Sequence, residues 1–461
     1  MTRSLPNGVL LAFYGDDFTG STDAMEVTAL AGLKTVLFTA TPDDAALERF
    51  KDYPVVGIAG TARSKGPDWM EAHLPAVFER LAALQPRLIQ YKVCSTFDSS
   101  PETGSIGKAI DIGCGVCEAT WAPSIVGAPH LGRWQVFGNL FAATGGEHFR
   151  IDRHPSMSRH PVTPMTEGDL TRHLAKQTER AIVSIDVAMM ASGHADAAAD
   201  KALSEGSVAF IDVVHDASQE EAGRLVWQRA NGKVFSASSS GLQYALVAHW
   251  RADGILSSRA PAFPPVAPVE KLLVLSGSCS VVTAQQIERA EKAGFASIRL
   301  DVLAAADPDR VAGEIERIGR DVRAAFEDHD GVLVYAARTV DDPAFANLQK
   351  EYGSDRETFT KAQDDIGLAL GRLAADLVPR LDLRRIVVAG GDTAGRVLET
   401  VPVTALEVAH PLGKGAPICR CHGSKPAFDG LQVVLKGGQL GGPDLFVEAL
   451  RGAEPAPNPR Q

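Results

Sequence analysis

Short apolar runs alternate with helical patterns along the first ninety residues of this chain. The predicted strands are four runs rich in aliphatic and aromatic residues, at 10–14, 35–39, 55–59 and 88–91. Amphipathic segments separate them at 21–31, 43–50 and 68–84. This alternation predicts a parallel sheet with crossover helices. The carboxyl ends of such strands meet at one edge of the sheet, where open α/β proteins bind their ligands.

The first predicted strand ends in an acidic loop and a helix start. Asp16 and Asp17 follow the strand directly and can accept a hydroxyl proton or hold a metal ion. Free amides over Thr19, Gly20 and Ser21 would favour an anion. An anionic polyol fits both properties. The alternative is a solvated turn in which Thr19 or Ser21 caps the helix.

The fourth predicted strand leads into a second polar loop, which contains Lys92, Ser95, Thr96 and Asp98. A helix start follows at 104–107. If the first and fourth strands are parallel, this loop and the acidic loop leave the same edge of the sheet. We therefore expect both loops to face one pocket.

A proline-rich basic loop is predicted at 150–165. It contains three prolines and five basic residues, among them Arg153, His154, Arg159 and His160. A long loop of this kind is often functional. We interpret it as a cationic patch for an anionic ligand, and the alternative is a solvated linker.

Length and composition predict two domains. A chain of 461 residues is too long for one ordinary core. Four prolines without helical or strand periodicity mark a boundary near 261–268. The predicted organisation is a first domain over 1–255, a linker over 256–269, a second domain over 270–452 and a disordered tail over 453–461. The expected fold class is α/β, with two lobes that each contain a mostly parallel sheet flanked by helices.

Charge and hydropathy limit the partners. The net charge of −11 argues against nucleic acid as the main partner. No apolar run is long enough to span a membrane, and the N-terminus lacks a signal-peptide pattern, so we expect a cytoplasmic protein without membrane contact. The cysteine pairs at 114/117 and 419/421 can be interpreted as halves of a zinc site. Buried reduced thiols fit a cytosolic chain better.

Three glycine- or serine-rich turns each follow a predicted strand of the second lobe: Ser276–Ser280, Gly390–Arg396 and Lys436–Gly442. Glycine in such turns lets backbone amides approach phosphate oxygens, and a helix start adds positive potential. The turns indicate a nucleotide site, with Lys436 and Arg396 as further cations. No P-loop, dinucleotide-binding glycine motif, nucleophile elbow or zinc-protease motif is present. The residues predicted to bind the cofactor are Ser276, Ser278, Ser280, Gly390, Gly391, Asp392, Thr393, Lys436, Gly437 and Gly438.

Five motifs occur in one order along nearly the whole chain, and together they resemble the four-carbon acid sugar kinase family. They are Gly15-Asp16-Asp17-Phe18-Thr19-Gly20-Ser21-Thr22-Asp23, Lys92-x-x-Ser95-Thr96, Gly277-Ser278-Cys279-Ser280, Gly390-Gly391-Asp392-Thr393 and Lys436-Gly437-Gly438. The resemblance implies an N-terminal lobe that holds a sugar acid, a C-terminal lobe that holds ATP, and an active site in the cleft between them. It places Asp16, Asp17 and Lys92 on the substrate side. Members phosphorylate tetronates or their 3-oxo forms.

This chain departs from the family pattern in the second loop. Many members have a carboxylate at the position of Cys94 and an arginine at the position of Asp98. Because arginine suits carboxylate recognition, the change makes the usual tetronate substrate doubtful. Arg153, His154, Arg159 and His160 are candidates to bind the anion instead. The variant loop is similar to the subgroup that acts on 3-oxo-isoapionate, a branched sugar acid.

The expected reaction is in-line transfer of the ATP γ-phosphoryl group to a terminal hydroxyl of a small sugar acid. Asp17 is the predicted orienting group or base, Asp16 supports it or a metal-bound water, and Lys92 binds the substrate carboxylate or the transferred phosphoryl group. Mg²⁺ would bridge the phosphates; its ligands cannot be read from the sequence, although Asp392 is one candidate. A hydroxy-acid dehydrogenase and a non-catalytic sugar-acid-binding protein are the rival interpretations. A homo-oligomer is compatible with all three.

Overall fold

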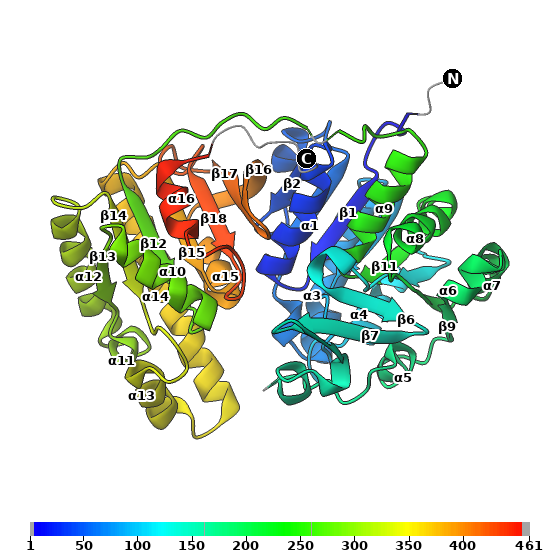
Figure 1. Ribbon diagram of the computed structural model, residues 1–461, viewed down its shortest axis with the longest axis horizontal. Helices are drawn as coiled ribbons and strands as arrows, with labels where there is room; N and C mark the ends of the chain where they lie inside the picture. The colour runs from blue at the N-terminus through cyan, green and yellow to red at the C-terminus, as the bar shows by residue number, and fades with distance from the viewer. Residues whose placement is uncertain (1–3, 161, 260, 454–461) are drawn as a thin grey trace. The chain divides into compact units, whose positions relative to one another are not determined.

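The computed structural model describes residues 4–160, 162–259 and 261–453. The chain divides into two compact units, Met1–Ala260 and Pro261–Gln461. Each unit is built from strands and helices that alternate along the chain, as Figure 1 shows. The predicted α/β class is confirmed.

Five parallel strands form the sheet of the N-terminal unit. Their spatial order is β2-β3-β1-β4-β11, and residues Leu11 to Gly15 of β1 pair with Leu88 to Lys92 of β4. Every residue of β1 and β4 is buried. This burial on both faces fits the continuous apolar run of β1, whereas β4 also buries Gln90 and Lys92. The strands are β1 (Leu11–Gly15), β2 (Thr35–Phe38), β3 (Val55–Ala59), β4 (Leu88–Lys92) and β11 (Phe235–Ser238).

Helices cover both faces of this sheet (Figure 1). α1 packs against β1, β2 and β3 and contacts α9, which packs on α8, whereas α3 and α4 pack together over β1, β4 and β11. α2 is short and contains no buried residue. Their bounds are α1 (Phe18–Leu30), α2 (Asp44–Glu48), α3 (Pro67–Ala82), α4 (Ile106–Val116), α8 (Asp216–Arg229) and α9 (Gly241–Ala252).

Two small sheets complete the N-terminal unit. One is parallel, in the order β5-β10-β9, and the other is an antiparallel meander, β6-β7-β8. Gly193, with a φ of 74°, lies between two of the helices of this region, α6 and α7. The elements are β5 (Ala122–Ser124), β6 (Arg133–Val136), β7 (Asn139–Thr144), β8 (Glu147–Arg150), α5 (Leu170–Leu174), β9 (Ile182–Ile185), α6 (Val187–Ala191), α7 (Ala195–Glu205) and β10 (Val208–Ile211).

The C-terminal unit contains a second five-stranded parallel sheet, extended by an antiparallel hairpin. Its order is β13-β14-β12-β15-β18, and β17 pairs antiparallel with β18 and β16. The hairpin was not expected from the sequence. The strands are β12 (Leu272–Ser276), β13 (Ala296–Arg299), β14 (Gly331–Tyr335), β15 (Arg385–Ala389), β16 (Val403–Gly413), β17 (Ala416–Gly423) and β18 (Gln432–Lys436).

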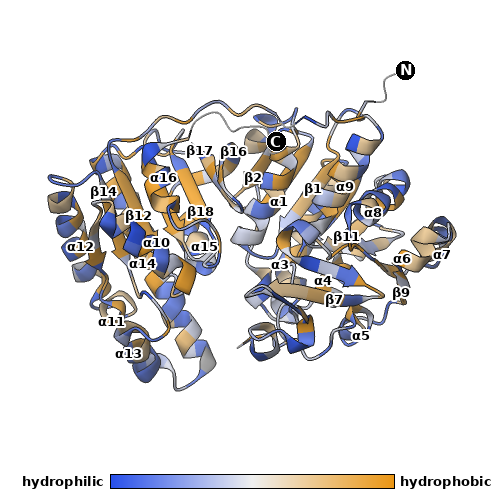
Figure 2. Cartoon of the chain, in the orientation of Figure 1, coloured by the Kyte–Doolittle hydropathy of each residue, from blue (hydrophilic) through white to orange (hydrophobic). Residues whose placement is uncertain are grey.

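Two groups of helices pack on this sheet. α10 and α16 contact each other and contribute buried residues to one core with the strands, while α12, α14 and α15 form a second packed group. Figure 2 shows apolar residues along the strands and polar residues on outer helices such as α8 and α12. The helices are α10 (Val281–Lys292), α11 (Val302–Ala305), α12 (Val311–Ala325), α13 (Pro343–Tyr352), α14 (Arg356–Arg380), α15 (Gly391–Thr400) and α16 (Leu445–Arg451).

The two parallel sheets share one topology. In each, the first strand has the third strand and then the second on one side, and the fourth and fifth strands on the other. The chain therefore changes direction across the sheet between β1 and β4 in one unit, and between β12 and β15 in the other. Ligand sites of open α/β sheets form at such switch points, at the carboxyl ends of the strands.

Part of the proline-rich stretch packs on the C-terminal unit. The amide of Val266 donates to the carbonyl of Ala453 at 2.8 Å, and the amide of Val269 donates to the carbonyl of Leu450 at 3.0 Å. The buried guanidinium of Arg385 donates to the carbonyl of Ala267 at 2.9 Å. Of the predicted tail, residues 454–461 lie outside the described part of the chain. Within the described residues, no helix combines the length and apolar character that crossing a bilayer requires.

Candidate active site

The acidic loop and the lysine loop meet at the switch point of the N-terminal unit. Gly15, the last residue of β1, pairs with Lys92, the last residue of β4. The amide of Asp16 donates to the carbonyl of Lys92 at 2.9 Å. The structure therefore brings together the three residues that the sequence predicted as catalytic: Asp16, Asp17 and Lys92.

Asp17 is the N-cap of α1. Its Oδ1 accepts a hydrogen bond from the amide of Gly20 at 2.7 Å, and its carbonyl accepts from the amide of Ser21 at 3.1 Å. The helix thus begins at Phe18, earlier than expected, and neither Thr19 nor Ser21 is its cap. Two of the amides predicted to attract an anion are engaged within the protein.

Asp16 is a buried carboxylate held by an arginine. Its side chain is 5% exposed, compared with 27% for that of Asp17. Arg63 donates to Asp16 from Nη2 at 2.8 Å and from Nε at 3.2 Å. Burial raises the pKa of Asp16 to about 6, against the opposing effect of Arg63, and the charge of Asp17 adds to the rise. The accessible carboxylate of this pair is Asp17.

Arg63 contacts both carboxylates of this candidate site, and sequence reasoning missed it. It lies in a short turn (Ala62–Ser64) that follows β3, the neighbour of β1 on the side opposite to β4. Its Nη1 lies 2.6 Å from Oδ2 of Asp17, so one guanidinium contacts both carboxylates. Burial opposes its charge, but Asp16 and Asp17 hold the pKa of Arg63 well above its ordinary value. A polar side chain just after a buried strand was the available signal.

Lys92 is buried at the end of β4, with 2% of its surface exposed. Its Nζ donates to the carbonyl of Val93 at 2.9 Å. A Cβ atom added to Gly20 would lie 2.6 Å from Nζ of Lys92 and 2.5 Å from Oδ1 of Asp17. The ammonium and the carboxylate therefore converge on a position that must lack a side chain.

Asp98 is held by two threonine hydroxyls within the second loop. Thr96 donates to its Oδ1 at 2.5 Å, and Thr163 donates to its Oδ2 at 3.0 Å. Burial opposes ionisation of Asp98, but the charge of Arg63 and the hydroxyl donors lower its pKa below the ordinary value. Thr96 also contacts Sγ of Cys94 at 2.9 Å. Asp98 is thus an anionic group close to the Asp16–Arg63–Asp17 cluster.

The backbone of this loop is strained at one point. Phe97 adopts a φ of 56°, which is uncommon for a residue with a side chain. Its ring is buried against Phe210 and His173. Packing of the ring therefore fixes the turn that aims Thr96 and Asp98. Ser95, in the same loop, is half-buried.

The basic loop reaches the site through Thr163 and not through its arginines. Arg153 and Arg159 are exposed. His154 is buried, and its Nδ1 accepts from the amides of Ser156 and Met157 at 3.2 and 3.3 Å. His160 Nδ1 accepts from the amide of Thr163 at 3.1 Å. The two histidines therefore shape the loop, whose residue 161 lies outside the described part of the chain.

The three small-residue turns meet at the switch point of the C-terminal unit. The amide of Gly277 donates to the carbonyl of Ala389 at 3.1 Å, and the amide of Gly390 donates to the carbonyl of Lys436 at 2.9 Å. Hydroxyls link the first turn to the third, because Ser280 and Thr283 donate to the carbonyl of Gly438 at 2.5 and 3.0 Å. The structure therefore brings the predicted nucleotide residues together.

Glycine is required where the turns touch. Gly390 adopts a φ of 120°, and a Cβ there would lie 2.8 Å from Oγ1 of Thr393 and 3.3 Å from the amide nitrogen of Ser278. A Cβ on Gly438 would lie 2.9 Å from Oγ of Ser278. Gly390 is the N-cap of α15 and supplies no side-chain cap. Closely approached amides at a helix start suit a phosphate group.

Lys436 forms hydrogen bonds that link the third turn to α10. It is fully buried, and its Nζ donates to Oγ1 of Thr283 at 2.7 Å, to Oε1 of Gln286 at 2.8 Å and to the carbonyl of Gly438 at 3.3 Å. Burial lowers the pKa of Lys436 to about 8. Arg396, the other predicted cation, forms a two-pronged pair with Asp364 at 2.7 and 2.9 Å.

A zinc site finds no support. All six cysteines are free thiols. In the parts of the chain that are described, no three His, Cys, Asp or Glu side chains cluster in a way that could hold a metal ion. Mg²⁺ differs from zinc here, since it usually needs only one or two carboxylates in addition to substrate phosphates and water.

Comparisons with known proteins assign a different binding role to each of the two units. A family model for a sugar-binding N-terminal domain matches residues 11–246, and a model for a nucleotide-binding C-terminal domain matches residues 273–446. A 3-oxo-isoapionate kinase from Paraburkholderia graminis is 48% identical over 96% of this chain and 94% of its own. The chain belongs to the four-carbon acid sugar kinase family. The resemblance seen in the sequence is thereby confirmed, and with it the class of enzyme, a phosphotransferase acting on a sugar acid.

Two further similarities are lower in sequence identity. A 3-oxo-tetronate kinase from Cupriavidus necator is 31% identical over 97% of this chain and 98% of its own. A crystal structure described as a putative tRNA synthase from Salmonella typhimurium LT2 has a TM-score of 0.77 at 23% identity, and covers 96% of this chain and 98% of that one. The latter likeness supports the fold alone.

Proposed function

We propose that this kinase transfers the γ-phosphoryl group of ATP to a terminal hydroxyl of a branched 3-oxo sugar acid of the 3-oxo-isoapionate type. The observation that carries the proposal is the 48% identity, over 96% of the chain, to a 3-oxo-isoapionate kinase, compared with 31% to a 3-oxo-tetronate kinase. The relatives are described as kinases, which favours phosphoryl transfer over the hydride transfer of a dehydrogenase or mere binding.

Asp17 is the proposed orienting group or base for the attacking hydroxyl. It is the accessible carboxylate of the pair, and its Oδ1 is fixed by the Gly20 amide and its Oδ2 by Arg63. Fixed geometry matters in phosphoryl transfer, because catalysis there depends mainly on positioning and charge neutralisation. Asp16 supports Asp17 indirectly, because it fixes the position of the Arg63 guanidinium that contacts Asp17.

Lys92 is the proposed contact for the substrate carboxylate or the transferred phosphoryl group. Arg63 already forms charged contacts with two carboxylates, whereas Lys92 Nζ donates to the neutral carbonyl of Val93. Asp98 with Thr96 would face the sugar hydroxyls. The other predicted substrate contacts, Thr19, Gly20, Ser21, Ser95, Arg153, His154, Arg159 and His160, stay predictions.

ATP is the proposed phosphoryl donor, held at the turns of Ser276–Ser280, Gly390–Thr393 and Lys436–Gly438. The turns pack closely against one another at Gly390 and Gly438, and the start of α15 lies at Gly390, an arrangement that suits a phosphate group and supports the proposal. Lys436 would stabilise the arrangement of the turns through its buried hydrogen bonds. Mg²⁺, when bound, would neutralise the phosphate charge, with Asp392 as a candidate contact.

The test is a panel of sugar acids assayed for ATP-dependent ADP release. We expect 3-oxo-isoapionate to give the highest kcat/KM, with 3-oxo-tetronates and tetronates below it. Asp17→Asn should lower kcat at least about 100-fold. The matched control is Asp43→Asn, which alters another helix cap of the same unit, where Asp43 accepts from the amide of Ala46 at 2.7 Å.

Two outcomes would contradict the proposal in different ways. Absence of ADP release with every sugar acid would reject the kinase assignment. Undiminished turnover by Asp17→Asn would reject the role of Asp17 but not the reaction. The cleft between the units, the cytoplasmic location and the homo-oligomer stay predictions.

A further inference from the structure

Arg133 is a half-buried arginine without a carboxylate partner among the described residues. It is the first residue of β6, and its Nη1 donates to the carbonyls of Leu131, Gly132 and Ala143 at 3.3, 3.0 and 3.5 Å. Its Nε is buried and has no hydrogen-bond partner in the described part of the chain. Burial lowers the pKa of Arg133, yet a guanidinium stays charged at neutral pH. The protein therefore keeps a partly desolvated cation without an ion-pair partner.

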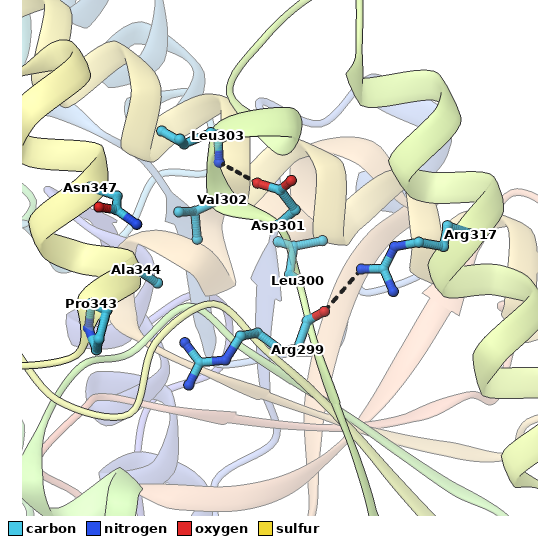
Figure 3. Close-up of a pocket in the computed structure, with 9 residues that line it drawn as sticks. All are labelled: Arg299, Leu300, Asp301, Val302, Leu303, Arg317, Pro343, Ala344 and Asn347. Atoms are coloured by element: carbon cyan, nitrogen blue, oxygen red, sulfur yellow. Dashed lines mark hydrogen bonds between the residues drawn. The ribbon is translucent and has the colours of Figure 1, made fainter.

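The two arginines that line a pocket of the C-terminal unit differ from Arg133 in this respect. The pocket has a volume of about 380 Å³, and Arg299 and Arg317 are among its lining residues (Figure 3). Nη1 of Arg299 lies 2.7 Å from Oδ1 of Asp342, and Nη2 of Arg317 lies 2.6 Å from Oε1 of Glu314. An isolated buried charge costs free energy, which a counter-ion offsets. A cation that the fold leaves unpaired is therefore a candidate contact for an anionic ligand.

Backbone contacts connect Arg133 with the sheet edge at which Lys92 lies. Ser238, the last residue of β11, pairs with Lys92 of β4. The amide of Ile125, in the loop after β5, donates to Oγ of Ser238 at 2.8 Å. Ala128 in the same loop exchanges two backbone hydrogen bonds with Arg133, at 3.0 and 3.2 Å. The loop that leads into β6 therefore starts at the edge that carries the candidate active site.

The charge of Arg133 also acts on two loops of that site. Cys94, in the same loop as Thr96 and Asp98, opposes the effect of burial on the pKa of Arg133. Burial and the charge of Arg133 together lower the pKa of His154, in the basic loop. Arg63 acts on Cys94 as well, so one thiol is close to both guanidinium groups.

The free edge of the Arg133 guanidinium suits a carboxylate. Nη1 is occupied by backbone carbonyls, whereas Nε and Nη2 donate to no other group of the residues that the structure describes. Two such atoms form a parallel N–H pair of the kind with which arginine binds a carboxylate. The cations predicted for this role are less suited, because Arg153 and Arg159 are exposed and Nδ1 of His154 accepts from two amides.

We infer that Arg133 binds the carboxylate of the sugar acid through Nε and Nη2, which leaves Lys92 to contact the transferred phosphoryl group. The inference rests on the proposed function and deepens it, because it names the residue that selects an acid over a neutral sugar. The substrate supplies the ion-pair partner that Arg133 lacks in the free protein.

Kinetics with a charged and a neutral substrate test this role. Wild type, Arg133→Gln and Arg133→Lys are assayed for ATP-dependent ADP release with 3-oxo-isoapionate and with its carboxamide, in which a neutral amide replaces the carboxylate. Arg172→Gln is the matched control, since it removes one positive charge from α5 of the same unit, where the Arg172 side chain is 75% exposed. Thermal melting checks that each variant folds.

We expect Arg133→Gln to raise the KM for the acid about 100-fold, to change kcat less than about threefold, and to leave kcat/KM for the carboxamide as in wild type. Arg133→Lys keeps the charge but not the planar fork, and should raise the KM for the acid about tenfold. Arg172→Gln should behave as wild type with both substrates.

The inference is overturned if folded Arg133→Gln has the KM of wild type for the acid, or if it loses as much kcat/KM with the carboxamide as with the acid. If Arg133→Gln does not fold, Arg133→Lys decides by the same two criteria. Absence of ADP release by wild type with every sugar acid would instead reject the proposed function, and this inference with it.

Discussion

Nη1 of Arg63 lies 2.6 Å from Oδ2 of Asp17, and the same guanidinium donates twice to Asp16. One arginine, supplied by the loop after β3, thus fixes both carboxylates supplied by the loop after β1. Because the carboxylates are adjacent and repel each other, the arginine offsets a repulsion that would otherwise displace them. This relationship explains how an acidic loop can hold one defined geometry.

Arg63→Met should disrupt the site and the fold together. Removing one partner of a buried ion pair leaves an uncompensated charge and costs about 3 kcal/mol or more of unfolding free energy. Urea unfolding measures this loss, and steady-state kinetics should show a kcat at least tenfold lower. Arg63→Lys retains the charge but not the planar fork, and should recover only part of both. A methionine variant as stable and active as wild type would refute the bridging role.

The stability contribution of Asp16 should depend on pH. Its pKa rises from about 3.8 in the unfolded chain to about 6 in the folded protein because of burial. Between these values the folded state binds more protons, so the contribution of Asp16 to the unfolding free energy is largest below pH 4 and decreases as the pH rises through 6.

Comparison with Asp16→Asn isolates this effect. The variant cannot titrate at this position, so its unfolding free energy relative to wild type should improve by roughly 1–3 kcal/mol between pH 4 and pH 7. Asp212, whose pKa burial also raises to about 6, is present in both proteins and cancels. Urea titrations at several pH values provide the measurement. A difference that does not vary with pH would show that Asp16 does not titrate in this range.

Gly390→Ala should impair nucleotide binding selectively. The new Cβ would meet Thr393 Oγ1 at 2.8 Å at a backbone φ of 120°, so the turn must shift. We expect a KM for ATP raised about tenfold or more, with the KM for the sugar acid little changed, which corresponds to a loss of about 1.4 kcal/mol. Gly442→Ala is the control, since a Cβ there meets nothing within 4 Å. Equal effects from both substitutions would argue against a specific role of Gly390.

Lys436→Met should loosen all three turns. The variant removes the donor that serves Thr283, Gln286 and the carbonyl of Gly438, and it leaves buried acceptors unsatisfied at about 1–3 kcal/mol. A lower melting temperature and a higher KM for ATP are expected. Lys425→Met replaces an exposed lysine of the same unit and should change neither. A normal KM for ATP in a destabilised Lys436→Met would limit this lysine to a role in folding.

Buried strands were the most predictable part of the fold. All five residues of β3, Val55–Ala59, are buried, so the apolar run and the strand coincide. The hairpin of β16 and β17 was missed because its signal is alternation. Cys419 and Cys421 are buried and Arg420 between them is exposed. A chelating motif and a half-buried strand share that pattern, and only strand pairing distinguishes them.

The sequence predicted those residues of the candidate site that belong to recognisable motifs. Asp16, Asp17 and Lys92 stand at strand ends that the sequence could place on one edge. Arg63 also follows a predicted strand, but a lone arginine belongs to no motif that singles it out, and its contacts depend on β3 lying next to β1. The sequence identified His154 and Lys436 as candidate cations of the basic loop and of the third turn. It could not show that both side chains form hydrogen bonds within the protein, because those bonds depend on residues that only the fold brings close.

Direct transfer of a radiolabelled γ-phosphoryl group from ATP to 3-oxo-isoapionate tests the central claim. Wild type and Asp43→Asn should convert the sugar acid to a labelled phosphate ester at equal rates, whereas Lys92→Met and Asp17→Asn, both folded by thermal melting, should be at least about 100-fold slower. If label never enters the sugar acid in the presence of wild-type protein, or enters it as fast with Lys92→Met and Asp17→Asn, the proposed phosphoryl transfer at this site is wrong.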